Sequence, residues 1–249
     1  MNSLRVSAFF IVISFHFVSA AAETTPNDAQ ISEKALQTTV RFERRRDKGE
    51  YISIGHGSAF GIDLSHFGVD SHRYMLSAAH LVLEEGQLTR GDLRVELGKA
   101  KSWTKCRVVA IDKAHDICLL ECDRDLESLT KLGDGDQKLG SRVLIAGSPQ
   151  GVPICLSSGR LLSKEPHVER DVWEAAAKFN HGNSGGPVFD ADTGKVIGVA
   201  VAGLRTADGE MEEGVAFFTP VKLIKSFLYD SVAEILLKDG KSPAHISVR

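Results

Sequence analysis

The sequence lacks several features that would place it in a specialised class of protein. Only four of its 249 residues are cysteine, too few for a disulfide scaffold and too scattered for a zinc ribbon. Its net charge is only −3, and no long basic run is present, which disfavours a nucleic-acid or anionic-membrane partner. The 43% hydrophobic and 25% charged content is ordinary for a globular protein and excludes a disordered, collagen-like or coiled-coil chain.

The N-terminal segment has the pattern of a secretory signal peptide. Arg5 lies in a short polar start, an apolar run covers Val6–Val18, and small residues at Ser19–Ala22 provide cleavage sites. The run is about 13 residues long, whereas a membrane span needs about 20, which favours cleavage over the alternative of an uncleaved anchor. We therefore expect residues 1–22 to be a signal peptide and the mature protein to be periplasmic or secreted, without membrane contact.

An exported chain would expose its cysteines to an oxidising compartment. If the chain forms a hairpin that turns near Ala114, Cys106 and Cys122 face each other across its two strands. Cys118 and Cys122 share one of those strands at about 13 Å, too far apart to bond. We therefore prefer the pairs Cys106–Cys122 and Cys118–Cys155, with buried free thiols as the open alternative.

Short segments rich in Val, Ile and Phe, bounded by Gly, Asp, Ser and Pro, indicate strands throughout the mature chain. The expected strands are 36–43, 51–63, 74–77, 93–97, 106–111, 117–122, 142–146, 154–162, 172–178, 188–189, 196–202 and 215–219. Because no helices alternate with them, they predict all-β barrels or sandwiches. The charged run 43–50 is expected to be an exposed hairpin tip. Apolar residues at helical spacing predict a C-terminal amphipathic helix over 221–239 that packs on the body.

Three segments carry the residue types of nucleophilic catalysis. Met75–His80 ends a strand in small residues and a histidine, His115–Leu120 places an aspartate before an apolar strand, and Gly182–Pro187 places a serine in a glycine-rich turn. A serine hydroxyl needs an imidazole base, and a carboxylate holds that imidazole in the correct tautomer. Glycines let the amides of Gly182 and Ser184 converge on an oxyanion. The candidates for base, acid and nucleophile are His80, Asp116 and Ser184.

These segments resemble those of trypsin-like serine peptidases of the chymotrypsin fold, in particular the HtrA/Deg branch. The resemblance runs from about Ala35 to Thr219 and is most specific at Gly182–Val188. Gly55–Ile62 and Ile145–Gly151 also match the family's glycine-containing segments. It implies two six-stranded antiparallel β-barrels, over 35–125 and 132–220, with the active site between them. It further implies a serine endopeptidase without cofactor or metal that cleaves unfolded or exported polypeptides through an acyl-enzyme.

The resemblance also assigns supporting residues. The amides of Gly182 and Ser184 would form the oxyanion hole, and one strand edge would pair with an extended peptide substrate. That edge consists of Ala200, Val201, Ala202 and Gly203. Its small side chains, opposite residues 215–217, predict a small or medium apolar residue before the scissile bond. Asn183 replaces an aspartate that pairs with a new N-terminus in digestive relatives, so we expect no activation cleavage. We also expect no PDZ module, which HtrA-type relatives usually carry.

The same residues allow other interpretations. Gly182–Gly186 also fits the G-x-S-x-G elbow of α/β-hydrolases, but that fold needs a histidine after the acid and the only later histidine is His245. His115 and His181 are expected to be exposed loop residues, and the remaining histidines show no metal-ligand spacing. A protein-binding or chaperone-like module with a resting-inactive site, and an esterase of the same fold, remain as alternatives.

Overall fold

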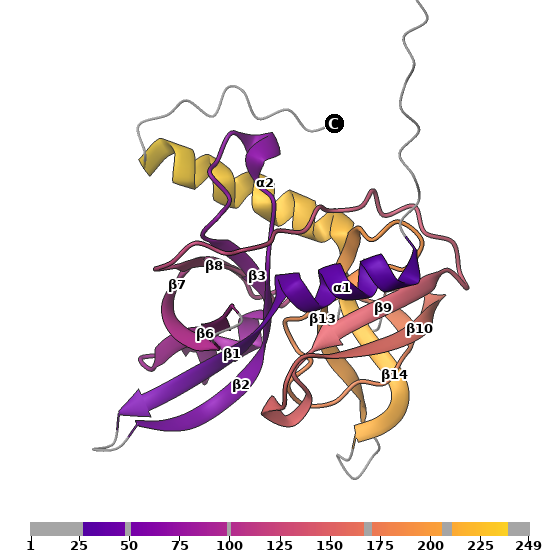
Figure 1. Cartoon of the computed structure of the whole chain (residues 1–249), viewed down its shortest axis with the longest axis horizontal. Coiled ribbons are helices and arrows are strands. Elements are labelled where there is room, and N and C mark those ends of the chain that lie inside the picture. The colour runs from indigo at the N-terminus through magenta and orange to yellow at the C-terminus, as the bar shows by residue number, and fades with distance from the viewer. Residues whose placement is uncertain (1–26, 48–50, 99–100, 167–170, 206–210, 239–249) are drawn as a thin grey trace, which may run out of the picture.

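A computed structural model describes residues 27–47, 51–98, 101–166, 171–205 and 211–238 (Figure 1). Six strands close the first antiparallel barrel in the order β1-β2-β3-β8-β7-β6. They are β1 (Thr39–Asp47), β2 (Tyr51–Gly61), β3 (Tyr74–Ser77), β6 (Asp92–Leu97), β7 (Ser102–Asp112) and β8 (Ile117–Cys122). A short two-stranded sheet of β4 (Leu83–Glu84) and β5 (Gln87–Leu88) lies outside this barrel.

Six further strands close the second barrel in the order β10-β11-β14-β13-β12-β9. They are β9 (Arg142–Gly147), β10 (Cys155–Ser163), β11 (Trp173–Ala176), β12 (Pro187–Asp190), β13 (Val196–Arg205) and β14 (Met211–Pro220). The helices are α1 (Asp28–Thr38) and α2 (Val221–Lys238), with single turns η1 (Ser65–Phe67), η2 (Ala79–Leu81) and η3 (Pro149–Gly151). The predicted all-β fold of two six-stranded barrels with a C-terminal helix is confirmed.

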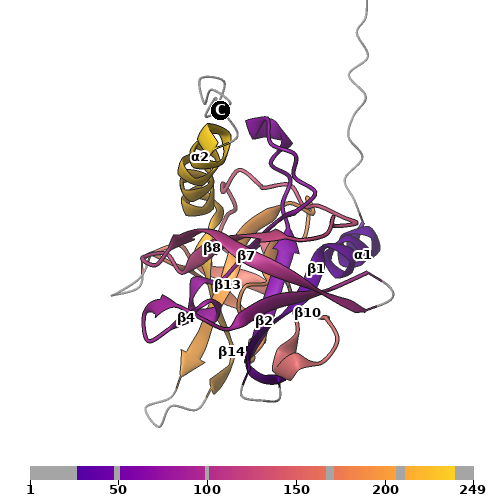
Figure 2. The same ribbon diagram turned by 90° about the vertical axis from the view of Figure 1, so that its left-hand side faces the viewer.

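Each barrel has its own core, and a third apolar cluster joins them. Strand β6 shows how the core of the first barrel is built, because its residues alternate between partly exposed and buried positions, with Leu93, Val95 and Leu97 turned inward. The joining cluster includes Phe60 from the first barrel and Phe189 from the second, together with apolar residues of both helices. The two barrels and both helices therefore share buried surface. Figure 2 shows α1 and α2 on different sides of the strands.

Helix α1 corrects the expected strand over 36–43, because Leu36 to Thr38 form its last turn and β1 begins at Thr39. The helix starts with a capping box, in which the side chains of Asn27 and Gln30 each accept a hydrogen bond from the other residue's backbone N–H. Ile31 and Ala35, one turn apart, are buried in the joining cluster. The polar composition of this segment hides both signals.

Most of the charged run 43–50 lies within a strand, whereas the sequence predicted an exposed hairpin tip. Glu43–Asp47 belong to β1 and pair with β2, while Phe42–Arg45 also pair with β6. The carboxylate of Glu43 accepts a hydrogen bond from Arg94 at 2.7 Å. Charged side chains on this strand therefore pair across the outer face of the sheet, as cross-strand neighbours do. Residues 48–50 lie outside the described residues.

The cysteines are free thiols in the structure, so the predicted disulfides are not formed. The inferred register is confirmed, since Cys106 pairs with Cys122 across β7 and β8. The Cys118–Cys155 pairing is wrong, because Cys118 is buried in the first barrel whereas Cys155 is exposed at the start of β10 in the second. Burial raises the pKa of Cys122 to about 12, so its thiol is protonated at neutral pH.

The predicted signal peptide lies outside the described residues. Among the helices that the structure does describe, neither is long and apolar enough to span a bilayer.

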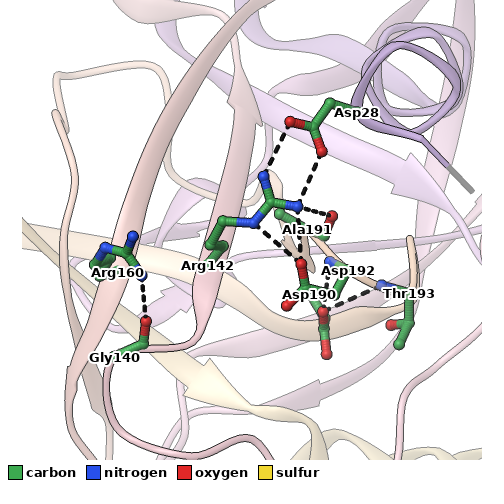
Figure 3. A network of polar contacts seen from close by, with 8 residues as sticks. All are labelled: Asp28, Gly140, Arg142, Arg160, Asp190, Ala191, Asp192 and Thr193. Atoms are coloured by element: carbon green, nitrogen blue, oxygen red, sulfur yellow. Dashed lines mark hydrogen bonds and ion pairs between the residues drawn. The ribbon is translucent and has the colours of Figure 1, made fainter.

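An ion-pair network attaches α1 to the second barrel (Figure 3). The Arg142 guanidinium on β9 donates two hydrogen bonds to the carboxylate of Asp28, at 2.9 and 3.0 Å. It also donates to Asp192 from two nitrogens, at 3.0 and 2.8 Å. The hydrogen bonds and the charge of Arg142 lower the pKa of the Asp28 carboxyl group. The pKa of Asp28 is therefore lower in the folded state than in the unfolded state. The stability that its ion pair contributes is present above the unfolded pKa and is lost as pH falls through the folded pKa.

Arg142→Gln should therefore speed hydrogen exchange of the α1 amides by a few-fold at neutral pH, because exposed ion pairs contribute little individually. The matched control is Arg160→Gln, since Arg160 donates one hydrogen bond to the Gly140 carbonyl and has no hydrogen bond or ion pair to Asp28 in Figure 3. Exchange measured by mass spectrometry should separate the two variants at neutral pH and bring them together near pH 2. Equal α1 exchange in both variants at neutral pH would contradict this role for Arg142.

Candidate active site

His80 and Asp116 form a doubly hydrogen-bonded pair. His80 lies in η2, directly after β3, and Asp116 lies in the turn that leads into β8. The Asp116 carboxylate accepts the His80 backbone N–H on Oδ1 at 2.8 Å, and its Oδ2 lies 2.8 Å from the imidazole Nδ1. The Asp116 side chain is 12% exposed, whereas that of His80 is 43% exposed. The pair therefore presents a partly accessible imidazole that a buried carboxylate orients.

The backbone around Asp116 is fixed independently of its side chain. Asp116 has a φ of +56°, a left-handed conformation that aspartate adopts more readily than most residues. Its carbonyl accepts the Ala79 N–H at 3.1 Å, and the preceding His115 carbonyl accepts the Thr219 hydroxyl at 2.5 Å. Since Thr219 belongs to β14, the second barrel helps to hold the turn that carries the aspartate.

Ser184 lies in the glycine-rich turn before β12 and is 9% exposed. Its carbonyl accepts the backbone N–H of Ser58 on β2 at 2.8 Å. Gly185, at a φ of +82°, packs so closely that a Cβ there would lie 2.1 Å from the Ser58 carbonyl and 3.0 Å from the Ala78 nitrogen. Only glycine fits at this position. The serine turn of the second barrel therefore packs against the segment that carries His80.

The Ser184 hydroxyl donates to the Val201 carbonyl at 3.4 Å, a long contact. Among the described residues, no hydrogen bond joins it to the His80 imidazole. Hydrogen bonds between catalytic groups are commonly long or unformed before substrate binds. The absence of this bond is therefore compatible with a catalytic role for Ser184.

The backbone amides of Gly182 and Ser184 donate no hydrogen bond within the part of the chain that the structure describes. The His181 carbonyl accepts the Gln150 N–H at 2.6 Å. In a trans peptide the carbonyl and the next N–H point in opposite directions, so this bond turns the Gly182 N–H the other way. Gln150 was not among the predicted site residues, although it lies within the segment Ile145–Gly151 that matched the family.

The expected substrate edge on β13 begins one residue later than the motif suggests. The Ala200 N–H donates to the Gly186 carbonyl at 2.9 Å, and the Ala200 carbonyl accepts the Gly185 N–H at 2.7 Å. Val201 has no residue opposite it, because the pairing of β13 with β14 shifts there by one residue. Its carbonyl accepts the Ser184 hydroxyl at 3.4 Å. Of the four proposed edge residues, Val201 is therefore the one that contacts the serine side chain directly.

The other candidate histidines have separate places. His115, expected to be exposed, is partly buried, and its Nδ1 lies 2.6 Å from the Asp112 carboxylate on the same turn. His181 is exposed in the serine turn, as expected. Within the described ranges, no group of three or more His, Cys, Asp or Glu side chains could hold a metal ion.

The two barrels, with this pair and this serine turn where they meet, define the chymotrypsin-like class of folds. A family model described as a trypsin-like peptidase domain matches residues 64–199, more than half of the sequence. The chain therefore belongs to the trypsin-like peptidase family.

Curated relatives indicate which members of this family the chain resembles. The chain is 31% identical over 181 residues to a "Probable periplasmic serine endoprotease DegP-like" of Halomonas elongata, covering 71% of this chain and 35% of the relative. It is 29% identical over 221 residues to a protein of the same name from Pseudomonas putida, covering 87% and 41%. "Protease Do-like 1, chloroplastic" of Arabidopsis thaliana is 27% identical over 262 residues, covering 96% and 56%. The chain thus spans between about a third and a little over half of the length of these relatives.

Proposed function

We propose that this chain is an exported serine endopeptidase that hydrolyses peptide bonds with His80, Asp116 and Ser184. The observation that carries the proposal is the His80–Asp116 pair. Both carboxylate oxygens of Asp116 hold His80, one on its backbone and one on Nδ1, which leaves Nε2 free to act as a base. His80 lies on the segment against which the serine turn packs.

In the acylation half-reaction, the Ser184 hydroxyl leaves the Val201 carbonyl and attacks the carbonyl carbon of the scissile peptide. His80 Nε2 takes the hydroxyl proton as the new C–O bond forms, and Asp116 stabilises the resulting imidazolium. The negative charge on the former carbonyl oxygen is bound by the Gly182 and Ser184 amides. His80 then donates its proton to the leaving amine as the C–N bond breaks.

In the second half-reaction, water replaces the released amine and attacks the acyl-enzyme. His80 accepts a proton from that water, the same two amides bind the oxyanion again, and the proton returns to the Ser184 oxygen as the acid product leaves. The substrate strand would pair with β13 from Val201 onward, through Ala202 and Gly203. This pairing favours extended, unfolded polypeptides over folded ones.

The site of action follows from the N-terminal signal pattern and from the names of the relatives. Residues 1–22 have the composition of a cleavable export signal. Two of the relatives described above are named as periplasmic endoproteases. We therefore assign the mature protein to the periplasm or the cell exterior, where unfolded exported polypeptides would be its substrates.

A fluorophosphonate probe tests the assignment, because it reacts with serines activated by a neighbouring base. We expect stoichiometric labelling that peptide mapping locates at Ser184, and loss of labelling in Ser184→Ala and in His80→Ala. The matched control is His115→Ala, which removes a nearby histidine paired with a different carboxylate. Labelling at another residue, or labelling that survives in His80→Ala, would overturn the mechanism.

A second candidate is a protein-binding module with a resting-inactive site. It is favoured by the Ser184 hydroxyl donating to the Val201 carbonyl instead of the imidazole. In that case the chain would bind unfolded polypeptide, and the probe would fail to label Ser184 until a peptide was added. An esterase of the same fold is separated by comparing turnover of peptide and ester substrates.

A further inference from the structure

Ser58 lies on β2 where the first barrel meets the serine turn, and it is fully buried. Its backbone N–H donates to the Ser184 carbonyl at 2.8 Å. Its hydroxyl donates to the Gly182 carbonyl at 2.8 Å and accepts the Ser148 N–H at 2.9 Å. Its own carbonyl accepts the Ser77 hydroxyl at 2.7 Å. One residue of the first barrel therefore contacts both residues whose amides would bind the oxyanion.

A hydroxyl is needed at this position because it donates and accepts at the same time. Without the Ser58 hydroxyl, the Ser148 N–H would retain only the Gly182 carbonyl at 3.4 Å. That distance exceeds the range of about 2.7–3.2 Å for good N–H···O bonds. Buried amides and carbonyls require partners, so the Gly182 backbone would move to recover them.

Such a movement would matter for chemistry more than for substrate binding. Oxyanion donors act only when they are held at the position that the charged oxygen occupies in the transition state. The Gly182 carbonyl and N–H lie in adjacent peptide planes that meet at the Gly182 Cα, so a carbonyl that moves would also displace the donor. The Ser58 hydroxyl itself is directed at Gly182 and Ser148, and it does not touch the reacting atoms.

We propose that Ser58 is a positioning residue that holds the Gly182 and Ser184 amides in the geometry that binds the oxyanion. This inference rests on the proposed peptidase function and adds a residue of the first barrel to its machinery. It predicts a specific kinetic signature, in which kcat changes and KM does not.

Ser58→Ala should lower kcat on a peptide substrate by between about tenfold and 100-fold, the effect of a small misplacement of catalytic groups. KM should stay unchanged, because the β13 edge is not altered. The matched control is Thr130→Val, since Thr130 is also fully buried and its hydroxyl donates to the Gly61 carbonyl at 2.8 Å, away from the serine turn. This control should lose thermal stability and keep the wild-type kcat.

Two inhibitors give an independent measurement. A peptidyl boronate forms a tetrahedral adduct with Ser184 that uses the oxyanion donors, so its affinity should fall in Ser58→Ala by the same factor as kcat. A peptide with a reduced scissile bond (CH₂–NH) has no carbonyl oxygen, and its affinity should not change. Equal weakening of both inhibitors would show that Ser58 acts on the whole substrate site and would overturn the proposal.

Ser58→Cys guards against misfolding of the alanine variant, because a thiol fills nearly the same space with weaker hydrogen bonds. We expect a smaller kcat loss with the same unchanged KM, and it carries the test if Ser58→Ala does not fold. An unchanged kcat in a folded Ser58→Ala would overturn the proposal.

The proposed function can fail separately from the role of Ser58. If the wild-type protein cleaves no peptide but a fluorophosphonate labels Ser184, the labelling rate becomes the measurement, because the phosphoryl oxygen would use the same two amides. Slower labelling in Ser58→Ala than in Thr130→Val then supports the positioning role, and equal rates overturn it. Absence of labelling in the wild type, both without and with an added peptide, overturns both proposals.

Discussion

Replacing Asp116 by asparagine should lower kcat by about four orders of magnitude while both barrels stay folded. The carboxylate accepts two hydrogen bonds from the same residue, one from the His80 backbone N–H and one from the imidazole Nδ1, both at 2.8 Å. An amide side chain has only one oxygen. Because the backbone N–H can only donate, the oxygen remains with it and the NH₂ group turns toward Nδ1.

In this variant His80 adopts the wrong tautomer. Because Nδ1 faces a hydrogen-bond donor, it must be unprotonated, so the ring proton lies on Nε2. That is the nitrogen that should accept the proton of Ser184. A steady-state assay with a peptide substrate measures the loss, and circular dichroism checks the fold. The matched control is Asp112→Asn on the same turn, whose carboxylate contacts His115 Nδ1 at 2.6 Å. Similar kcat values for the two variants would contradict the assigned role of Asp116.

The fold was predictable wherever the signal was local. Strands of the two barrels were recognised from short apolar segments, and α2 begins at Val221, where the helical spacing begins. The register of Cys106 opposite Cys122 could be inferred because β7 and β8 are joined by a short turn. Helix α1 was missed because its buried apolar residues, Ile31 and Ala35, stand in a polar segment, and the residues that they pack against in the joining cluster lie far along the chain.

The site shows the same division between local and long-range information. His80, Asp116 and Ser184 each lie in a short segment whose residue types are demanded by their chemistry, so sequence was sufficient to nominate them. The bond from Ser58 to Gly182 joins residues 124 positions apart, and it exists only because the two barrels pack together. Hydrogen bonds between residues so far apart in the chain leave no local pattern in the sequence, so only the structure identifies them.

Gly182→Ala should lower kcat by about 10² to 10³, the effect of losing one oxyanion donor. Gly182 has a φ of +101°, which residues with a side chain rarely adopt. A Cβ at this position would lie 2.1 Å from the Ser148 carbonyl and 3.0 Å from the Gln150 nitrogen, so the turn must move. That movement would break the bond from Gln150 to the His181 carbonyl and turn the Gly182 N–H away from the oxyanion.

The matched control is Gly68→Ala, because Gly68 also has a positive φ, +75°, but a Cβ there meets nothing within 4 Å. It should cost some stability and leave kcat unchanged, whereas Gly182→Ala should lose kcat at nearly constant KM. The double variant Ser58→Ala/Gly182→Ala gives the stricter measurement. If both residues act on the same donor, the two losses will not multiply, because a donor already displaced cannot be displaced again. Fully multiplicative losses would mean that Ser58 and Gly182 act on different steps.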